Sequence, residues 1–376
     1  MRILQLMSCR GWSSDAYWAA RVSAELERAG HEVTLVCKHG TDTRVIERVR
    51  ETGLRRTETL AFASGVNPSS DLGDLRRLRH WLDRSDVVHV HRGKEHWLAA
   101  AANRWSARPR PLVRTRHIVQ PIRPHALNRW LYQRATSLVV TVTEAIRHQY
   151  VAADLLPADR VVAQPGGVDA DRFRPGIDGS AFRRSLGVPP AIPLLGIVSG
   201  FRVMKGHEVA IEAAEQLASA GRRFHLVFVG TGALEARIRG AIVAAGLERS
   251  ISLVGFVSDV PSAIAALDVA LYPALESDGM SRVLFEYLAM AKPVVASRVG
   301  VVPEVLEDGR TALVVPAGEP GQLAAAIGRV LDDGNLGRAM GAAARALVDE
   351  RLSGAALAEG LATYYHHLAT DIGRTV

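Results

Sequence analysis

Residues 274–297 read ALESDGMSRVLFEYLAMAKPVVAS, and this stretch decides the fold class. The apolar run 269–272 just before it predicts a strand, and 293–297 predicts a second strand. Between them, a polar loop at 276–279 leads into an apolar segment that predicts a helix from about 280 to 290. Strand, loop, helix and strand form a βαβ unit, which places ligands at the carboxyl ends of its parallel strands.

The start of this predicted helix has the residues of an anion site. We expect the N–H groups of Met280, Ser281 and Arg282 to point out of the first turn, where they would hold a phosphate group. Asp278 lies just before the helix and Glu286 two turns inside it. Because a carboxylate accepts up to four hydrogen bonds, two acids here suit sugar hydroxyls. The competing interpretation is structural, with Asp278 as a helix cap and Glu286 on a solvated face.

An acid, seven further residues, a glutamate and then PVVAS resemble the donor signature of the retaining glycosyltransferases of family 4, which have the GT-B fold. The resemblance implies an α/β protein with two Rossmann-like domains facing across a cleft and a C-terminal helix that crosses back to the first domain. Residues 1–168, with a crossing helix at about 352–376, would bind the acceptor, and 169–351 would bind the nucleotide sugar. In this pattern Asp278 replaces a usual Glu, Ser281 a Gly, and Arg282 an apolar residue.

Length and composition agree with two globular domains. A chain of 376 residues is long for one domain. No apolar run is long enough to cross a membrane, and the N-terminus lacks the long apolar core of a signal peptide. We therefore expect a cytoplasmic protein, peripheral on the inner face of the membrane. Cys9 and Cys37 have no metal-binding spacing, and we expect no disulfide between them.

The charge is concentrated in the first half. Residues 1–174 hold 28 Lys and Arg against 18 Asp and Glu, whereas the rest hold 18 against 21, which predicts an anionic partner for the first half. Residues 96–143 contain no acid, several aromatic residues and eight arginines: Arg104, Arg108, Arg110, Arg114, Arg116, Arg123, Arg129 and Arg134. This segment either meets an anionic acceptor or membrane surface, or it is a solvated basic face. We expect no nucleic-acid partner.

Two further elements of the first half are candidates for the site. Gly11 lies in the loop after the predicted strand 2–7, and the resemblance places this loop opposite the donor phosphate. His117 ends the strand LVRTRH, and the resemblance implies that it contacts the transferred sugar; the alternative is a core histidine with satisfied hydrogen bonds. His89 and His91 lie on one face of a predicted strand at 86–91, where we favour a structural or acceptor-pocket role over a metal site.

The second half contributes a basic loop. SGFRVMKG at 199–206 follows a predicted strand, and its Arg202 and Lys205 suit diphosphate oxygens. The resemblance implies that these two residues clamp the donor. It also implies donor contacts from the loops and helix start that carry Gly200, Gly230, Phe256, Val257, Gly279, Met280, Ser281, Arg282, Val283 and Glu286. We further expect a linker at 161–175 and helices over 336–369, of which residues 352–369 would cross back to the first domain.

Taken together, these features predict a retaining glycosyltransferase. It would move a sugar from a nucleoside diphosphate (UDP, GDP or ADP) to a cell-envelope glycan or lipid-linked acceptor of the lipopolysaccharide type. It would use no cofactor and no metal ion, with His117, Arg202, Lys205 and Asp278 as catalytic residues. Two alternatives stay open: a nucleotide-sugar epimerase of the same fold, and a non-catalytic carbohydrate- or nucleic-acid-binding protein.

Overall fold

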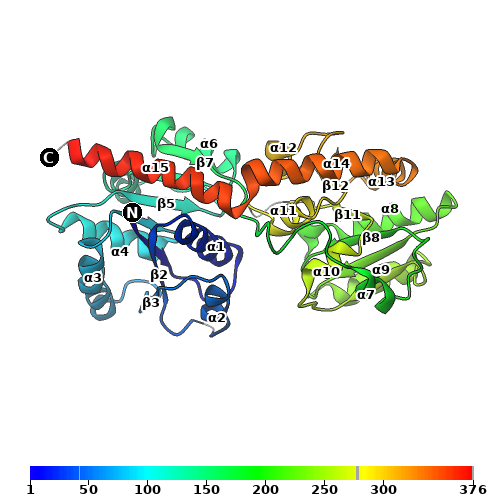
Figure 1. The fold of residues 1–376 in the computed structure, drawn as a ribbon, viewed down its shortest axis with the longest axis horizontal. Coiled ribbons are helices and arrows are strands. Elements are labelled where there is room, and N and C mark those ends of the chain that lie inside the picture. The colour runs from blue at the N-terminus through cyan, green and yellow to red at the C-terminus, as the bar shows by residue number, and fades with distance from the viewer. Residues whose placement is uncertain (42, 277–278, 375–376) are drawn as a thin grey trace. The chain divides into compact units, whose positions relative to one another are not determined.

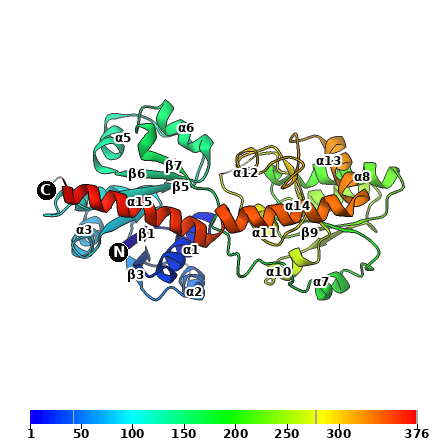
Figure 2. The ribbon, with the colours of Figure 1, turned by 45° about the horizontal axis from the view of Figure 1, so that its top comes forward.

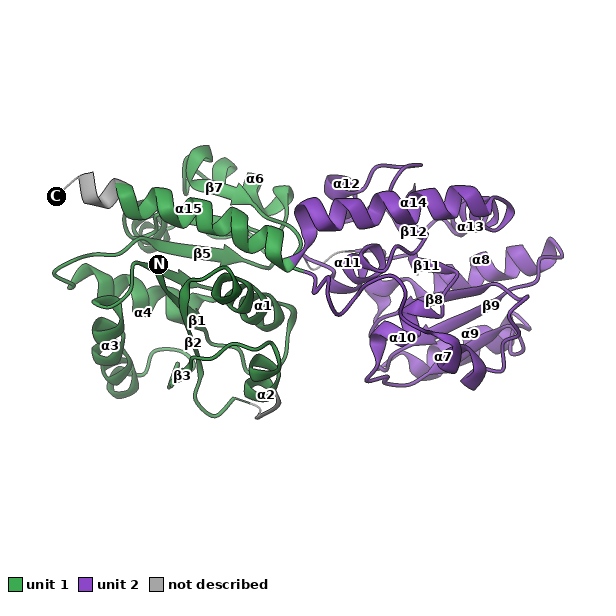
Figure 3. Ribbon diagram, viewed as in Figure 1, with its two compact units in different colours: residues 1–167, 354–376 green, residues 168–353 purple. Residues whose placement is uncertain are grey.

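The structure, a computed structural model, describes residues 1–41, 43–276 and 279–374. The chain divides into two compact units (Figures 1 and 3). Unit 1 comprises Met1–Gly167 and Gly354–Val376, and unit 2 comprises Val168–Ser353. Each unit is built on one parallel β-sheet with helices packed on it.

The sheet of unit 1 has seven parallel strands in the order β3-β2-β1-β4-β5-β6-β7. Central strand β1 pairs with β2 on one side and β4 on the other, so that Leu4 lies between Thr34 and Val88. The strands are β1 (Arg2–Met7), β2 (Glu32–Lys38), β3 (Thr57–Leu60), β4 (Val87–Val90), β5 (Leu112–Arg116), β6 (Leu138–Thr141) and β7 (Val161–Ala163). The central strands are buried on both faces, and their sequences are therefore nearly continuous apolar runs.

The helices of unit 1 group by their contacts. Helix α1 contacts α2 and α15, whereas α3 contacts α4, and α4 contacts the π-helix Trp130–Ala135. Figure 2 shows α15 running along α1. The bounds are α1 (Ser14–Arg28), α2 (Thr43–Glu51), α3 (Pro68–Leu82), α4 (Gly93–Arg104), α5 (Ala126–Arg129), α6 (Glu144–Ala152) and α15 (Gly354–Arg374).

The sheet of unit 2 has six parallel strands in the order β10-β9-β8-β11-β12-β13. They are β8 (Leu194–Val198), β9 (His225–Val229), β10 (Ile251–Val254), β11 (Val269–Tyr272), β12 (Val294–Ser297) and β13 (Leu313–Val315). The helices are α7 (Ser180–Ser185), α8 (His207–Ser219), α9 (Glu235–Ala244), α10 (Val260–Ala265), α11 (Arg282–Ala289), α12 (Val302–Val305), α13 (Pro320–Asp332) and α14 (Gly334–Leu347). Residues of α8, α9 and α13 share one apolar core with the strands. The predicted α/β class with two Rossmann-like domains is confirmed.

The structure divides the predicted helical region 336–369 into α14 and α15. Helix α14 ends at Leu347, a π-helical turn covers Val348–Leu352, and Ser353 has an extended backbone (φ −68°, ψ 159°) before α15 begins. The break coincides with the boundary between the units. At this point the Val168 N–H donates to the Leu352 carbonyl at 3.2 Å, so the two places where the chain leaves unit 2 lie side by side.

Two other segments differ from expectation. The predicted linker 161–175 starts too early, because Val161–Ala163 form β7 and Val161 pairs with Val139 of β6. Residues 39–75, to which no helix or strand was assigned from the sequence, contain α2, β3 and the start of α3. Among the described residues, no helix is both long and apolar enough to cross a membrane.

Candidate functional site

The order of the strands locates the crevice of unit 2. The chain moves outward from β8 through β9 to β10 and then returns to β11 on the other side of β8. Ligands bind at such a switch point, beyond the carboxyl ends of the strands. Here the loop after β8 carries residues 199–206, and the loop after β11 carries residues 273–281. The structure therefore brings the basic loop (199–206) close to the start of residues 274–297, the organising stretch.

The basic loop is held by backbone hydrogen bonds to its neighbour. The N–H of Phe201 donates to the Thr231 carbonyl at 3.0 Å, and the Phe201 carbonyl accepts from Leu234 at 3.4 Å. The Phe201 ring is buried. After this anchor, Val203–Lys205 form a 3₁₀ turn, which leaves Arg202 exposed and Lys205 half-buried. Two cations thus lie at the carboxyl end of β8.

Two glycines permit the close approach of these loops. Gly206 has φ +69°, and a Cβ atom there would lie 1.8 Å from the Pro273 carbonyl oxygen. Next to it, the Leu275 N–H donates to the Met204 carbonyl at 2.9 Å. At Gly230, a Cβ would lie 2.0 Å from the Ser199 carbonyl oxygen. Gly230 therefore packs against the basic loop, and its contact with a donor stays a prediction.

The helix of the organising stretch starts later than predicted. Helix α11 begins at Arg282, and Ser281 is its N-cap with an extended backbone (φ −98°, ψ 104°). The outward N–H groups of the first turn are thus those of Arg282, Val283 and Leu284 rather than of Met280 and Ser281.

Two predicted site residues precede this helix. Gly279, at φ +126°, turns the chain into the helix start. Asp278 lies outside the described residues. Its proposed contacts with sugar hydroxyls therefore stay a prediction.

Glu286 is a buried acid, not a residue of a solvated helix face. Its side chain is about 6% exposed and forms an ion pair with Arg282, with 3.1 Å between Oε1 and Nε. Burial raises the pKa of Glu286, and the charges of Arg282 and Arg172 counteract that effect. The neighbouring Tyr287 hydroxyl accepts from the Val198 N–H at 2.7 Å, which ties α11 to the end of β8.

Phe256 and Val257 lie at the same edge of the sheet but farther from the basic loop. They follow β10, which is separated from β8 by β9. Phe256 is 76% exposed. An exposed ring of this kind offers a flat surface for a nucleobase.

Sequence reasoning missed His207, the first residue of α8. Its ring is buried edge-on against Phe201 and Phe228, and Nε2 lies 3.3 Å from the Ser199 hydroxyl. Burial and the charge of Lys205 lower the pKa of His207 to about 4. A neutral His207 ring therefore packs against the basic loop through Phe201 and Ser199. The only signal was its position directly after Lys-Gly.

Unit 1 has its own switch point, between β1 and β4. A fully buried carboxylate, Glu95, joins the loops that follow these two strands. It accepts hydrogen bonds from the Ser8 N–H at 3.2 Å, the Ser8 hydroxyl at 2.5 Å and the Arg92 N–H at 2.7 Å. Gly11 lies in the first of these loops, and a Cβ there would meet no atom within 4 Å. Its role in close approach to a ligand stays a prediction.

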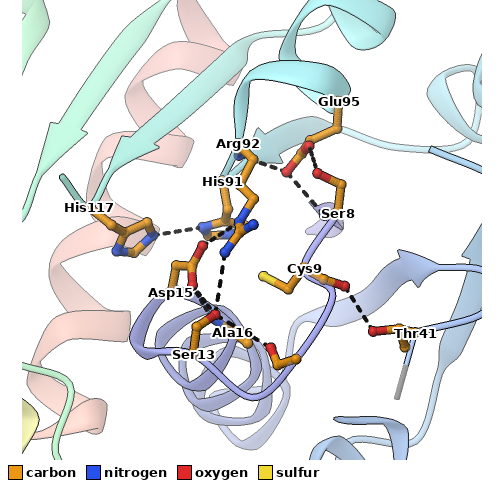
Figure 4. Close-up of polar contacts among 11 residues, drawn as sticks. Ser8, Cys9, Ser13, Asp15, Ala16, Thr41, His91, Arg92, Glu95 and His117 are labelled. Carbon is orange, nitrogen blue, oxygen red and sulfur yellow. Dashed lines mark hydrogen bonds and ion pairs between the residues drawn. The ribbon is translucent and has the colours of Figure 1, made fainter. Parts of the chain in front are cut away.

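An ion pair that the sequence did not reveal lies beside these loops (Figure 4). Asp15, on α1, contacts Arg92 with 2.5 Å between Oδ2 and Nε, and the Ser13 hydroxyl donates to the same carboxylate. Burial raises the pKa of Asp15, but the bonds from Arg92 and Ser13 and nearby positive charge outweigh it and hold the pKa well below its usual range. Figure 4 shows the pair next to His91 and His117.

His117 follows β5 and is half-buried. Its Nε2 lies 3.4 Å from Nδ1 of His91, and the edge of Trp18 packs against its ring with 5.3 Å between centroids. Its Nδ1 is buried with no hydrogen-bond partner among the described residues. Burial lowers the pKa of His117 to about 3.

His89 has a structural role, because its two nitrogens contact the Tyr365 and Thr115 hydroxyls at 2.5 and 2.6 Å. No group of three or more His, Cys, Asp or Glu side chains in the described part of the chain could hold a metal ion.

Comparison with known proteins explains why both units have this architecture. Residues 16–172 match the model described as Glycosyltransferase Family 4, and residues 192–333 match Glycosyl transferases group 1. A D-inositol 3-phosphate glycosyltransferase of Actinosynnema mirum is 30% identical, over 72% of this chain and 68% of that protein. The chain belongs to glycosyltransferase family 4.

The comparisons also found a further relative by sequence and a solved structure of similar fold. A 2-deoxystreptamine glucosyltransferase of Streptomyces kanamyceticus is 32% identical over 55% of this chain, and the alignment spans only 54% of that protein. The crystal structure of Anabaena HepE in complex with UDP superposes with a TM-score of 0.82 and 20% identity, covering 98% of this chain and 100% of that one. This likeness confirms the GT-B fold.

The family matches cover the unit 2 crevice more completely than that of unit 1. The second match includes Arg202, Lys205 and Glu286, whereas the first begins after Ser8, Gly11 and Asp15. Helices α14 and α15 lie outside both matches. The family match therefore leaves out Asp15, and its ion pair with Arg92 is known from the structure.

Replacing Gly206 by alanine tests the close approach of the two loops. The new Cβ would clash with Pro273 in a backbone conformation that itself costs about 1–2 kcal/mol. We expect a total cost of about 3 kcal/mol, which lowers the midpoint of thermal unfolding of unit 2 by roughly 6–12 °C. The matched control is Gly221→Ala at the other end of α8, where φ is +74° and no atom lies within 4 Å. Equal shifts for the two variants would contradict the steric argument.

Proposed function

We propose that this chain is a glycosyltransferase that moves a sugar from a nucleoside diphosphate sugar to an acceptor hydroxyl. One observation carries the proposal: the loop with Arg202 and Lys205 is hydrogen-bonded to the loop that leads into α11, whose second turn holds the buried acid Glu286. Two cations and a helix N-terminus suit a diphosphate, and an acid suits ribose hydroxyls. The bound UDP in the Anabaena structure supports a nucleotide donor.

In the proposed mechanism, the protein stabilises the charges that develop while the sugar is transferred. As the sugar–phosphate bond breaks, positive charge builds on the sugar ring and negative charge on the departing diphosphate. Lys205, Arg202 and the start of α11 would stabilise that diphosphate, and such preorganised charge is usually the largest contribution to catalysis. We propose that these groups do the work of a divalent metal ion. Asp278 and His117 would hold the sugar, and Phe256 and Val257 would face the nucleobase.

We propose a cell-envelope glycan or lipid-linked acceptor, of the lipopolysaccharide type, bound by unit 1. The named substrate of the Actinosynnema relative is a phosphorylated polyol, which supports an anionic acceptor. The excess of Arg and Lys in residues 1–174 supports the same choice. UDP, GDP and ADP sugars are the donors to test.

Replacing Lys205 by alanine tests the diphosphate clamp. Removal of one preorganised charge-stabilising group should lower kcat by roughly 10²–10³-fold. The measurement is steady-state transfer or donor hydrolysis, whichever the donor screen reveals first. The matched control is Arg239→Ala on α9 of the same unit, whose partner is the exposed Glu235. That variant should stay within about twofold of the parent protein, because exposed ion pairs contribute little.

The same assay checks the clamp in a second way. With Lys205 and Arg202 supplying the positive charge, activity should survive an excess of chelator. A loss of less than about fivefold in Lys205→Ala would remove the lysine from the mechanism, and activity abolished by chelator would remove the metal-independent account.

We propose that transfer proceeds with retention of the anomeric configuration. This class uses same-face attack with the leaving phosphate as base, so it needs no protein nucleophile, and we propose none. The anomeric coupling constant in the proton NMR spectrum of the first product, recorded before mutarotation, should match that of the donor. An inverted product would contradict the proposal.

In the structure, only some arginines of the basic segment 96–143 are available to bind a partner. Arg114 is buried, whereas Arg110, Arg116 and Arg129 make hydrogen bonds to nearby carbonyl oxygens. Within the described part of the chain, the exposed arginines of this segment whose guanidinium groups have no hydrogen bond or ion pair are Arg104, Arg108, Arg123 and Arg134.

An exposed aromatic pair accompanies these four cations. The rings of Trp97 and Trp130 stack with 6.0 Å between centroids and are 36% and 37% exposed. Leu127, on α5, is also exposed. Exposed stacked indoles and exposed arginines in one segment suit the boundary between lipid headgroups and acyl chains. We propose that this surface binds an anionic membrane and places the protein there as a peripheral protein.

Vesicle flotation tests the membrane surface. The protein should float with phosphatidylcholine vesicles that contain phosphatidylglycerol and not with phosphatidylcholine alone at moderate salt, because the attraction is electrostatic. The double variant Trp97→Ala, Trp130→Ala should reduce the bound fraction by roughly tenfold or more. Trp81→Ala, on α3, is the control. Binding unchanged in the double variant, or no flotation at all, would contradict the proposal.

A further inference from the structure

A line of three hydrogen-bonding side chains crosses the core of unit 1 and ends at His117. Gln5, on β1, is fully buried, and its Oε1 lies 2.8 Å from Nε2 of His91. The other nitrogen of His91, Nδ1, lies 3.4 Å from Nε2 of His117. The remaining nitrogen, Nδ1 of His117, is buried and has no partner among the described residues. Each ring nitrogen along the line thus has an assigned neighbour except the last.

Both imidazoles are neutral near pH 7. Burial lowers the pKa of His91 far below its usual value, and burial lowers that of His117 to about 3, with the charge of Asp15 only partly counteracting it. No carboxylate in the described part of the chain hydrogen-bonds to either ring, because Asp15 is occupied by Arg92 and Ser13. A neutral imidazole carries one N–H, so the partner of one nitrogen decides the state of the other.

The Gln5 amide sets the direction of the line. Its carbonyl oxygen can only accept, so His91 carries its proton on Nε2 and leaves Nδ1 as an acceptor. His117 must then carry its proton on Nε2 in order to donate to His91. At the other end of the amide, Nε2 of Gln5 is buried with no hydrogen-bond partner among the described residues.

We propose that Gln5 is a positioning residue that, through His91, fixes His117 as the Nε2–H tautomer and turns its Nδ1 into a hydrogen-bond acceptor for a hydroxyl group. A hydroxyl can donate to this atom, whereas a deprotonated phosphate oxygen or a carbonyl cannot. His117 therefore selects the hydroxyl-bearing part of a ligand. That the hydroxyl belongs to the transferred sugar or to the acceptor rests on the proposed function; the tautomer does not.

The surroundings keep the three groups in place. The Trp18 ring packs edge-on against His89, His91 and His117, with 5.3–6.0 Å between centroids. The charged groups that face the two rings are Asp15 from α1, Arg92 from the loop after β4, and Arg114 and Arg116 from β5. Tyr365, on α15, belongs to the same buried group, and its hydroxyl is hydrogen-bonded to His89.

Histidine side-chain NMR tests the tautomer directly. Long-range ¹H–¹⁵N correlation spectra of ¹⁵N-labelled full-length protein at neutral pH distinguish the two neutral tautomers, and His117→Gln assigns the His117 signals by their loss. We expect the Nε2–H pattern for both His91 and His117. An Nδ1–H pattern for His117, or a charged ring, would overturn the proposal whatever the enzyme assays show.

Gln5→Met tests the part played by the amide. Without the carbonyl acceptor, His117 should show a mixture of the two tautomers, while Thr136→Val, which removes the partner of His96 elsewhere in unit 1, should leave His117 unchanged. His91→Phe keeps a ring against Trp18 and should have the same effect as Gln5→Met, which covers the case in which that variant does not fold. A pure Nε2–H pattern retained in a folded variant would remove Gln5 from the proposal.

Kinetics then separate this inference from the proposed function. Gln5→Met should lower kcat by roughly tenfold, the value of one hydrogen bond, with little change in KM for the nucleotide donor, because the donor diphosphate is bound by unit 2. A change in tautomer with no loss of kcat would keep the inference about the ring and remove its catalytic use. An inactive parent protein with the expected spectrum would count against the function alone.

Discussion

The hydrogen bond from the Leu275 N–H to the Met204 carbonyl joins the two loops on which the proposed donor crevice depends. It brings backbone against backbone, which requires a residue without a side chain at Gly206. The cations of one loop and the helix start that follows the other are thereby fixed at neighbouring strands before any ligand arrives. Charge that is already in position needs no reorganisation when negative charge develops on a leaving group.

Unit 1 joins its two loops by different means. There a buried carboxylate, Glu95, takes three hydrogen bonds from Ser8 and Arg92, so the contact depends on one side chain rather than on a glycine. A buried acid is tolerated only when its acceptor positions are filled. The arrangement therefore couples the loop geometry of unit 1 to a small polar network, whereas unit 2 depends on steric fit.

The sequence predicted the strands well because both sheets are parallel and buried on both faces. Residues 2–7, 251–254 and 269–272 are short apolar runs whose limits match β1, β10 and β11. The expected start of the crossing helix at about 352 came from the family resemblance rather than from a local pattern, and the structure places the break at Ser353, on the boundary between the units.

Site residues that belong to local sequence patterns were predicted, whereas those that meet only through the tertiary fold were not. Lys205 and Glu286 lie in local patterns, but Asp15 and Arg92 are 77 residues apart and meet only once the order of β1 and β4 is known. Lys292, which follows α11, was given no role from the sequence. Its ammonium group instead donates to the Ala265 and Leu267 carbonyls at 2.6 and 2.7 Å, a contact set by tertiary packing alone.

The return of the chain to unit 1 has a consequence for biosynthesis. Helix α15 packs along α1, and its Leu357, Leu361 and Tyr365 are buried in unit 1. A ribosome makes residues 1–167 first and these last, with all of unit 2 in between. Until translation reaches α15, the apolar face of α1 has no cover and His89 lacks its tyrosine partner. The unit that begins the chain is thus the last to complete its core.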